Sequence, residues 1–135
     1  MQSYLPMQWD QTVNAFKGRG FWSRIYPAYL SCHGSHTARA WTAPSDGLTK
    51  VVGSVTNGQT QCGDGVVLTI YRRRASTGNI GLLWGPVIME AFEASTLEHD
   101  LSVLVDEGDM IYFQVDPRHQ GSCDGAVWNP TVTLK

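Results

Sequence analysis

Apolar and polar residues alternate with a period of two along most of the chain from residue 36 onward. Successive side chains of a β-strand point to opposite faces, so this alternation predicts strands with one buried face. The clearest case is residues 110–115, in which Ile111, Phe113 and Val115 share one face. Residues 66–72 carry apolar side chains on both faces, which predicts a central strand.

Turn residues rich in Gly, Pro, Asn and Asp separate these segments. The predicted strands are residues 36–42, 48–56, 66–72, 80–84, 87–92, 97–105, 110–115 and 127–134, with one more short strand near residues 21–26. We expect residues 97–105 and 110–115 to form a hairpin. Pro130 predicts an edge position or a bulge in the last strand. Helix is expected at most for a turn or two over residues 10–16.

Eight or nine short strands at a spacing of about ten residues predict an all-β fold, an antiparallel β-sandwich of jelly-roll type. The 135 residues suit a single domain, so we predict one domain over residues 1–135, with an irregular segment at residues 1–35. Trp41, Trp84 and Trp128 lie inside the predicted strands and are expected to contribute to the core.

The charge balance changes the range of expected partners. Charged residues make up 16% of the chain and the net charge is −2, so we expect no general attraction to nucleic acid or to an anionic membrane surface. No apolar run approaches the length of a membrane-spanning helix, which predicts a soluble chain. The first ten residues show no basic segment followed by an apolar one, so we expect no secretory signal there.

Three cysteines bear on the compartment. Cys62 and Cys123 lie in similar turns rich in Gly and Asp, and we predict a disulfide between them, which requires an oxidising compartment. Two alternatives stay open: Cys32 is the true partner of one of them, or all three are reduced thiols in a cytosolic protein.

Several motifs follow one another along the chain. They are Arg39-Ala-Trp41-Thr-Ala-Pro44-Ser-Asp-Gly47, Val51-Val-Gly53-Ser-Val55, Cys62-Gly63-Asp64-Gly65-Val66, Leu83-Trp84, Gly108-Asp109-Met-Ile-Tyr-Phe113-Gln-Val-Asp116, and Asp124 with Trp128-Asn-Pro130. Taken together they resemble the carbohydrate-binding modules that are appended to secreted polysaccharide-degrading enzymes. The resemblance covers residues 36–134. It implies a jelly-roll fold, a polysaccharide or oligosaccharide ligand, a secreted or extracellular setting and the catalytic domain of a larger chain as partner.

Sugar binding has its own physical requirements. The C–H face of a pyranose ring packs on an aromatic side chain, and the hydroxyls need planar polar partners. Aromatic residues near the N-terminus follow no clean alternation, so we expect some of them to be exposed. The predicted glycan-binding residues are Trp9, Trp22, Arg24, Tyr26, His36 and Asp124.

No cofactor is expected, and the metal question stays open. A structural calcium ion is an alternative in which the loops of Asp64 and Asp124 supply oxygen ligands, although the loop spacing of an EF-hand is absent. Cys32, His33 and His36 form one short cluster without the second half that a zinc site needs. We interpret residues 72–74, all Arg, as a solvated hairpin tip, with binding of an acidic sugar as the alternative.

No catalytic motif is present, and we predict a chain that is not an enzyme. Glu90, Glu93 and Glu98 are candidates for the paired carboxylates of a glycosidase only by composition. The alternative to glycan binding is a structural or oligomerising jelly roll of capsid, fibre or adhesin type, in which the aromatic residues form a subunit interface.

Overall fold

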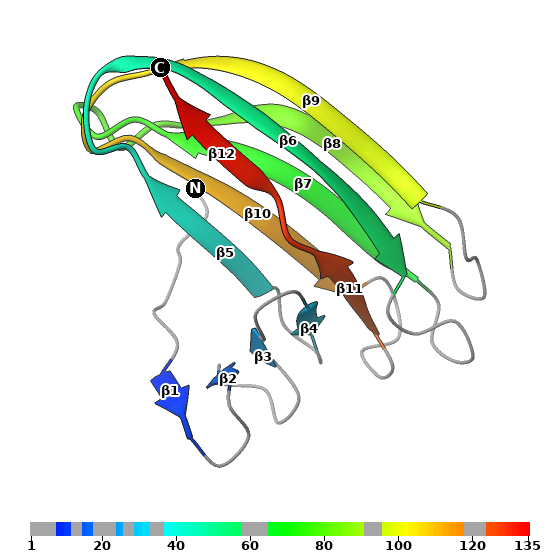
Figure 1. Cartoon of the computed structure of the whole chain (residues 1–135). Coiled ribbons are helices and arrows are strands. Elements are labelled where there is room, and N and C mark those ends of the chain that lie inside the picture. The colour runs from blue at the N-terminus through cyan, green and yellow to red at the C-terminus, as the bar shows by residue number, and fades with distance from the viewer. Residues whose placement is uncertain are drawn as a thin grey trace.

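The computed structural model describes residues 8–11, 15–17, 24–25, 29–32, 37–57, 65–90, 96–117 and 124–135, and in these residues the chain is all strand and turn (Figure 1). The strands are β1 (Gln8–Asp10), β2 (Ala15–Lys17), β3 (Arg24–Ile25), β4 (Tyr29–Cys32), β5 (Thr37–Thr42), β6 (Gly47–Asn57), β7 (Val66–Arg73), β8 (Ile80–Met89), β9 (Thr96–Val105), β10 (Met110–Pro117), β11 (Asp124–Trp128) and β12 (Thr131–Leu134).

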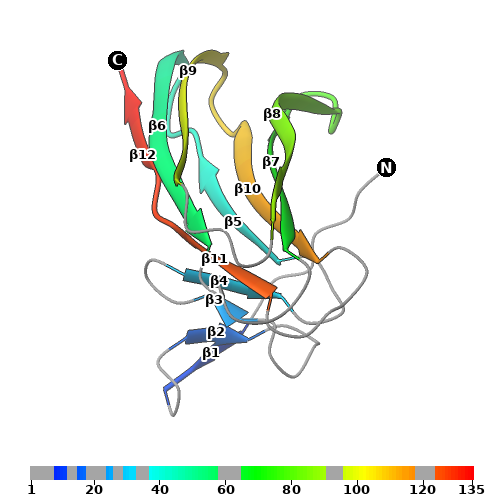
Figure 2. The same cartoon turned by 90° about the vertical axis from the view of Figure 1, so that its right-hand side faces the viewer.

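The strands form two antiparallel sheets that face each other (Figure 2). The small sheet has the order β5-β10-β7-β8. In the large sheet β6 pairs along its length with β9 on one side and with β11 and then β12 on the other. Beyond β11 the large sheet continues through β4, β3 and β2 to β1.

The chain crosses from one sheet to the other at nearly every connection after β4. Among β5 to β12, only the pair β7 and β8 and the pair β11 and β12 are consecutive strands of the same sheet. The predicted β-sandwich with crossed, jelly-roll connections is therefore confirmed, with eight strands over residues 37–134. The prediction of a hairpin between residues 97–105 and 110–115 is wrong, because β9 pairs with β6 and β10 pairs with β5 and β7.

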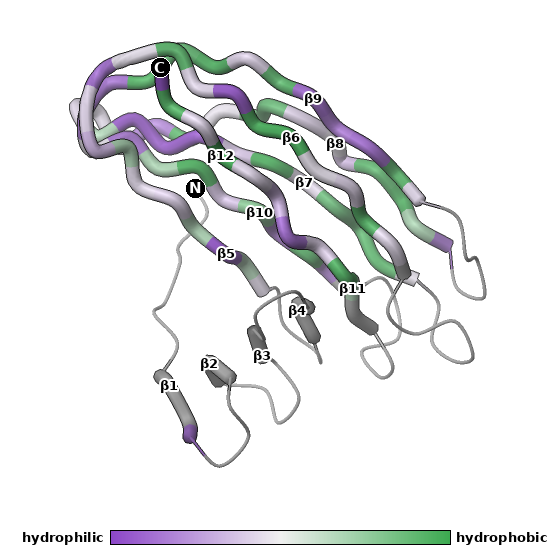
Figure 3. Tube along the Cα trace, viewed as in Figure 1, coloured by the Kyte–Doolittle hydropathy of each residue, from purple (hydrophilic) through white to green (hydrophobic). Residues whose placement is uncertain are grey.

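The core lies between the two inner faces, where apolar side chains from alternate positions meet. Figure 3 shows hydrophobic and hydrophilic residues following one another along the strands of both sheets. Leu68 and Ile70 of β7, Phe113 and Val115 of β10 and Val51 of β6 are almost fully buried. The prediction that β7 is a central strand is confirmed, since β10 and β8 flank it. Trp128 is fully buried as expected, whereas Trp41 and Trp84 are half-buried and pack against the rim of the core.

Several predicted boundaries change. The break expected around Gly85-Pro86 is absent: β8 runs continuously through a cis peptide bond before Pro86, and the register against β7 shifts there. A sheet edge tolerates this proline because its missing N–H removes no ladder hydrogen bond. The last predicted strand is split at Pro130 into β11 and β12.

The N-terminal segment contains more strand than expected. β1 ends at Asp10 and β2 begins at Ala15, so the helical turn predicted over residues 10–16 is wrong at both ends. β3 confirms strand at Arg24–Ile25, inside the stretch where one short strand was expected. Four short strands thus extend the large sheet on the side of β11.

Candidate functional site

A small open pocket lies at one edge of the sandwich, where β5 of the small sheet and β12 of the large sheet are the outermost strands. Its volume is about 230 Å³. The described residues that line it are Arg39, Ala40 and Trp41 of β5, Phe113 of β10, Asn129 and Pro130 between β11 and β12, and Val132 of β12. We call these residues the edge pocket.

The alternation of β5 brings Arg39 and Trp41 into this pocket. Arg39 pairs in register with Phe113, and Trp41 pairs with Ile111, so both occupy the inward-facing rows of the small sheet. Phe113 and Ile111 are almost fully buried, whereas Arg39 and Trp41 are half-buried because no strand of the described residues lies beyond β5 in the sheet. An inward-facing position on an edge strand is therefore open to solvent on one side.

The polar side of the edge pocket joins the two sheets. Nη1 of Arg39 donates a hydrogen bond to Oδ1 of Asn129 over 3.2 Å, from β5 to the turn that precedes β12. Burial lowers the pKa of the Arg39 guanidinium, although the group keeps its charge at any physiological pH. The pocket thus combines an indole, a cation and an amide with apolar walls.

This combination suits a sugar ring. A half-buried indole offers apolar area to C–H groups, and a guanidinium and an amide offer planar donors and acceptors to hydroxyls. A volume of about 230 Å³ is smaller than the roughly 300–1,000 Å³ of pockets for drug-sized ligands, so the space corresponds to one ring rather than to a long chain.

None of the glycan-binding residues predicted from the sequence is among the described residues that line the edge pocket. Trp22, Tyr26 and His36 are outside the described residues. The backbone places Trp9 in β1 opposite Phe16, Arg24 in β3 opposite Lys17 and Ser31, and Asp124 in β11 opposite Cys32. Trp9, Arg24 and Asp124 thus belong to one sheet, and β3 and β4 lie beside β5 (Figure 1).

Sequence reasoning missed the edge pocket. It assigned Trp41 to the core and gave Arg39 and Asn129 no separate role. The available signal was Arg39 itself, a charged residue two positions before Trp41 and therefore on the same face of the strand. A cation on a predicted inward face indicates that this face is not fully covered.

The predicted disulfide stays a prediction, and the calcium site stays an alternative. Cys62, Cys123 and Asp64 lie outside the described residues. Cys32 is the last residue of β4, and its backbone pairs with that of Asp124. In the described part of the chain no group of three or more His, Cys, Asp or Glu side chains is arranged to hold a metal ion.

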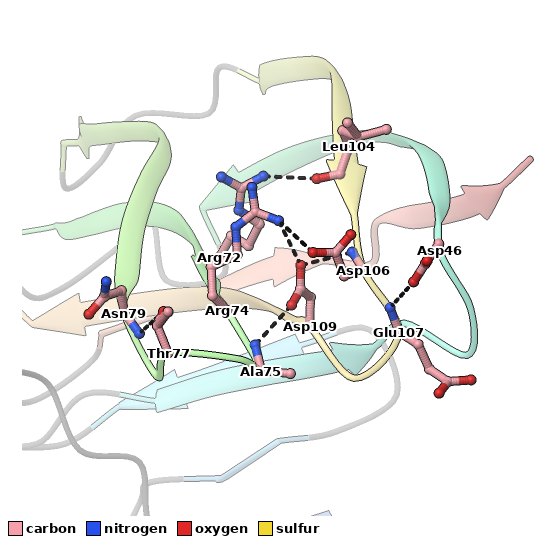
Figure 4. Close-up of polar contacts among 10 residues, drawn as sticks. All are labelled: Asp46, Arg72, Arg74, Ala75, Thr77, Asn79, Leu104, Asp106, Glu107 and Asp109. Atoms are coloured by element: carbon pink, nitrogen blue, oxygen red, sulfur yellow. Dashed lines mark hydrogen bonds and ion pairs between the residues drawn. The ribbon is translucent and has the colours of Figure 1, made fainter.

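Two of the three consecutive arginines have structural roles at a corner of the sandwich (Figure 4). Arg72 donates to the Leu104 carbonyl over 2.9 Å, and Arg74 donates to Oδ2 of Asp109 over 3.1 Å. The interpretation of a solvated hairpin tip is therefore wrong for Arg74, which reaches Asp109 in the connection between β9 and β10, and incomplete for Arg72, whose side chain contacts the backbone of Leu104 inside β9. Arg73 is exposed.

Asp109 is the centre of this corner and is almost fully buried. Its carboxylate accepts hydrogen bonds from the backbone N–H groups of Ala75 and Asp106, each over 2.9 Å, in addition to the one from Arg74. Burial alone raises the pKa of Asp109, but the two N–H groups and the Arg74 guanidinium outweigh it and leave the pKa below its ordinary value. The Asp109 side chain thus caps one local backbone N–H group, that of Asp106, and one that is distant in the sequence, that of Ala75.

A buried histidine joins the two sheets inside the core. His99 of β9 lies among Trp84, Phe113 and Trp128, with ring centroids 5.3 to 6.4 Å from its own. Nε1–H of Trp128 donates to Nε2 of His99 over 3.0 Å, which leaves the proton of the neutral ring on Nδ1, 3.4 Å from the Val51 carbonyl oxygen. Burial is the main cause that lowers the pKa of His99, so the neutral form is favoured.

The remaining sequence candidates do not form a site in the described residues. Glu90 and Glu98 are exposed at the end of β8 and on β9, and Glu93 is outside the described residues. Among the described residues no helix is long and apolar enough to cross a membrane.

Comparison of the chain with protein-family models found no match, and comparison with curated proteins found none either. The functional argument therefore depends on the geometry of the edge pocket and on the sequence motifs.

Proposed function

We propose that this chain is a non-catalytic carbohydrate-binding domain that keeps an attached polysaccharide-degrading enzyme close to its glycan. The observation that carries the proposal is the edge pocket, where the indole of Trp41 lies beside the guanidinium of Arg39 and the amide of Asn129. A β-sandwich hosts many functions, so the fold by itself is weak support. The order of motifs along residues 36–134, which resembles that of carbohydrate-binding modules, is the second support.

The geometry suggests how a sugar would bind. One face of a pyranose ring would pack on Trp41, and its hydroxyls would exchange hydrogen bonds with Arg39 and Asn129. Of the residues predicted from the sequence, Arg24 belongs to β3, which lies beside β5, so a longer glycan would extend from the edge pocket toward β3. A single small pocket gives low affinity, which becomes useful when tethering raises the effective concentration of the attached enzyme at its substrate. This role fits a secreted or extracellular protein.

The test is isothermal titration calorimetry of the domain against a panel of neutral and acidic oligosaccharides. We expect weak binding to at least one of them, and Trp41→Phe should weaken it by about tenfold through the loss of ring area. The matched control is Trp84→Phe, because Trp84 is also half-buried against the core but does not line the pocket. Equal losses in both variants would remove Trp41 from the site, and no binding to any oligosaccharide would refute the proposed function.

One observation favours the second candidate, an oligomerising jelly roll. Leu48 of β6 and Leu104 of β9 lie directly opposite each other on the outer face of the large sheet and are 47% and 65% exposed. Exposed apolar side chains that lie side by side are a feature of surfaces covered in an assembly when they belong to a larger apolar patch. Light scattering distinguishes the two candidates: a stable trimer that Leu104→Ser dissociates supports assembly, and a monomer at all concentrations refutes it.

A further inference from the structure

The buried His99 lies directly behind the edge pocket. The centroid of its ring is 6.4 Å from that of Phe113, which lines the pocket, and 5.8 Å from that of Trp128. Trp128 is fully buried and is followed in the chain by Asn129 and Pro130, which line the pocket on the side of the large sheet. His99 thus contacts one lining residue and, through Trp128, the backbone that carries two more.

Gly53 of β6 shows how closely these groups are packed. A Cβ atom at Gly53 would lie 3.0 Å from Nε2 of His99 and 3.1 Å from Cα of Pro130, both tighter than ordinary van der Waals contact. The backbone of β6 therefore fills the space between the imidazole and the turn that leads into β12. A displacement of the His99 ring toward this side presses on Pro130 through β6 instead of entering empty space.

The hydrogen bond between His99 and Trp128 depends on the protonation of the imidazole. Nε1–H of Trp128 donates to Nε2 of His99 over 3.0 Å, and an indole N–H can only donate, so Nε2 has to carry a free lone pair. Protonation of Nε2 would bring two donors face to face. The indole N–H would lose its buried acceptor, and a positive charge would lie among the rings of Trp84, Phe113 and Trp128.

Charged residues near His99 modify this equilibrium. Those on β9 and on the described elements around it and around the pocket are Lys50 of β6, Glu98 and Asp100 of β9, Glu90 after β8, Asp116 of β10, Asp124 of β11 and Arg39 of β5. Asp100, which forms an ion pair with Lys50 over 2.8 Å, and the Val51 carbonyl raise the pKa of His99, but burial lowers it and outweighs both. The ring is therefore neutral at pH 7 and takes up a proton only below about pH 6.5.

We propose that His99 is a positioning residue of the edge pocket: its neutral imidazole holds Trp128 and with it the wall formed by Asn129 and Pro130, and protonation in acid releases this wall. The inference goes beyond the glycan-binding role because it concerns the shape of the pocket itself, and only its consequence for sugar affinity rests on that role. One pH unit below the pKa of His99, about one chain in eleven keeps the neutral ring, so a ligand of the closed pocket should bind about tenfold more weakly.

The primary test is an NMR titration of the unmodified domain from about pH 7 to about pH 4. The indole N–H signal of Trp128, the side-chain amide of Asn129 and the indole N–H of Trp41 should shift with the same midpoint as the His99 ring. His99→Gln, which keeps an acceptor for Trp128, should remove the shifts of the Asn129 and Trp41 signals. Pocket signals that stay constant while His99 titrates overturn the inference. Cooperative unfolding at that midpoint overturns it as well, because protonation would then unfold the domain instead of opening the pocket.

A pair of glycine variants tests the mechanical link without changing a titratable group. Gly53→Ala places a methyl group against His99 and Pro130 and should shift the Asn129 and Trp41 signals already at pH 7. The matched control is Gly81→Ala, whose Cβ would meet no atom within 4 Å and should leave both signals in place. Unchanged signals in Gly53→Ala overturn the link, and this pair decides the question even where His99→Gln impairs folding.

Calorimetry separates the inference from the proposed function. The probes are neutral trimers of glucose, mannose and galactose, which carry no group that titrates in this range, so a pH dependence of binding belongs to the protein. Binding that weakens about tenfold one pH unit below the pKa of His99, and does not weaken in His99→Gln, supports the inference. Binding that is independent of pH overturns it and leaves the glycan-binding role standing. Absence of binding to any trimer counts against that role alone, and the NMR titration still decides the inference.

Discussion

The buried carboxylate of Asp109 makes the sharpest prediction about stability. Asp109→Ala removes the acceptor of three hydrogen bonds, from Arg74 and from the backbone N–H groups of Ala75 and Asp106. Each hydrogen bond to a charged group contributes about 1.5–3 kcal/mol, but the three share one acceptor and do not add fully. The Arg74 side chain is 35% exposed and keeps the Asp106 carboxylate 3.5 Å away, so its charge is not left buried and unpaired. We therefore expect the free energy of unfolding to fall by about 2–3 kcal/mol.

The control for this variant is the neighbouring acid. The Asp106 carboxylate lies 3.5 Å from the same Arg74 guanidinium, but its side chain is 65% exposed. Exposed ion pairs contribute about 0–1 kcal/mol, so Asp106→Ala should change stability by less than 1 kcal/mol. Urea denaturation followed by tryptophan fluorescence measures both variants. A loss below 1 kcal/mol in Asp109→Ala, or equal losses in the two variants, would refute the assignment of Asp109 as the centre of the corner.

The same carboxylate predicts a pH dependence. The native state lowers the pKa of Asp109, so the unfolded chain binds more protons than the native chain as pH falls below the ordinary range of an Asp, about 4. The stabilisation by Asp109 is therefore fully present above about pH 5 and declines as the pH falls further. Asp109→Asn, which cannot ionise, should be less stable than the natural chain at pH 7 by a margin that narrows toward pH 3.

Two further predictions concern the core and the cysteines. Because burial lowers the pKa of His99 in the native state, protonation favours the unfolded chain, and the free energy of unfolding should decline as the pH falls below about 6.5. His99→Gln keeps an acceptor for the Trp128 indole N–H and should remove this pH dependence. Denaturation measured from pH 5 to 7 tests the prediction. A Cys62–Cys123 disulfide predicts one free thiol in the unfolded, unreduced chain and a cross-linked peptide pair in mass spectrometry after proteolysis; three free thiols would refute it.

Alternation in the sequence predicted the positions of most strands because it reports which face of each strand is buried. β7 and β10 show this well, since their inward-facing residues are almost fully buried and flanking strands cover both sides. Alternation does not indicate which other strand a given strand pairs with in the sheet. The turn at residues 106–109 suits a hairpin as well as a crossing between sheets, and the crossing is held by Arg74, which is 35 positions away from Asp109.

The edge pocket shows that alternation also does not predict how exposed an inward-facing residue is. The alternation of residues 37–42 placed Trp41 correctly on an inward face, but burial at that position depends on whether another strand lies beyond β5. The place of β5 at the edge of the sheet is decided by pairings with residues more than 60 positions away, such as Phe113 opposite Arg39. Arg39 is the residue in the local sequence that reflects these distant pairings, because a guanidinium on an inward-facing row needs access to water or a polar partner such as Asn129. A charged residue that interrupts an apolar face in a β-sandwich therefore marks the sheet edge, and in this chain the edge is also where aromatic and polar groups meet to form the candidate site.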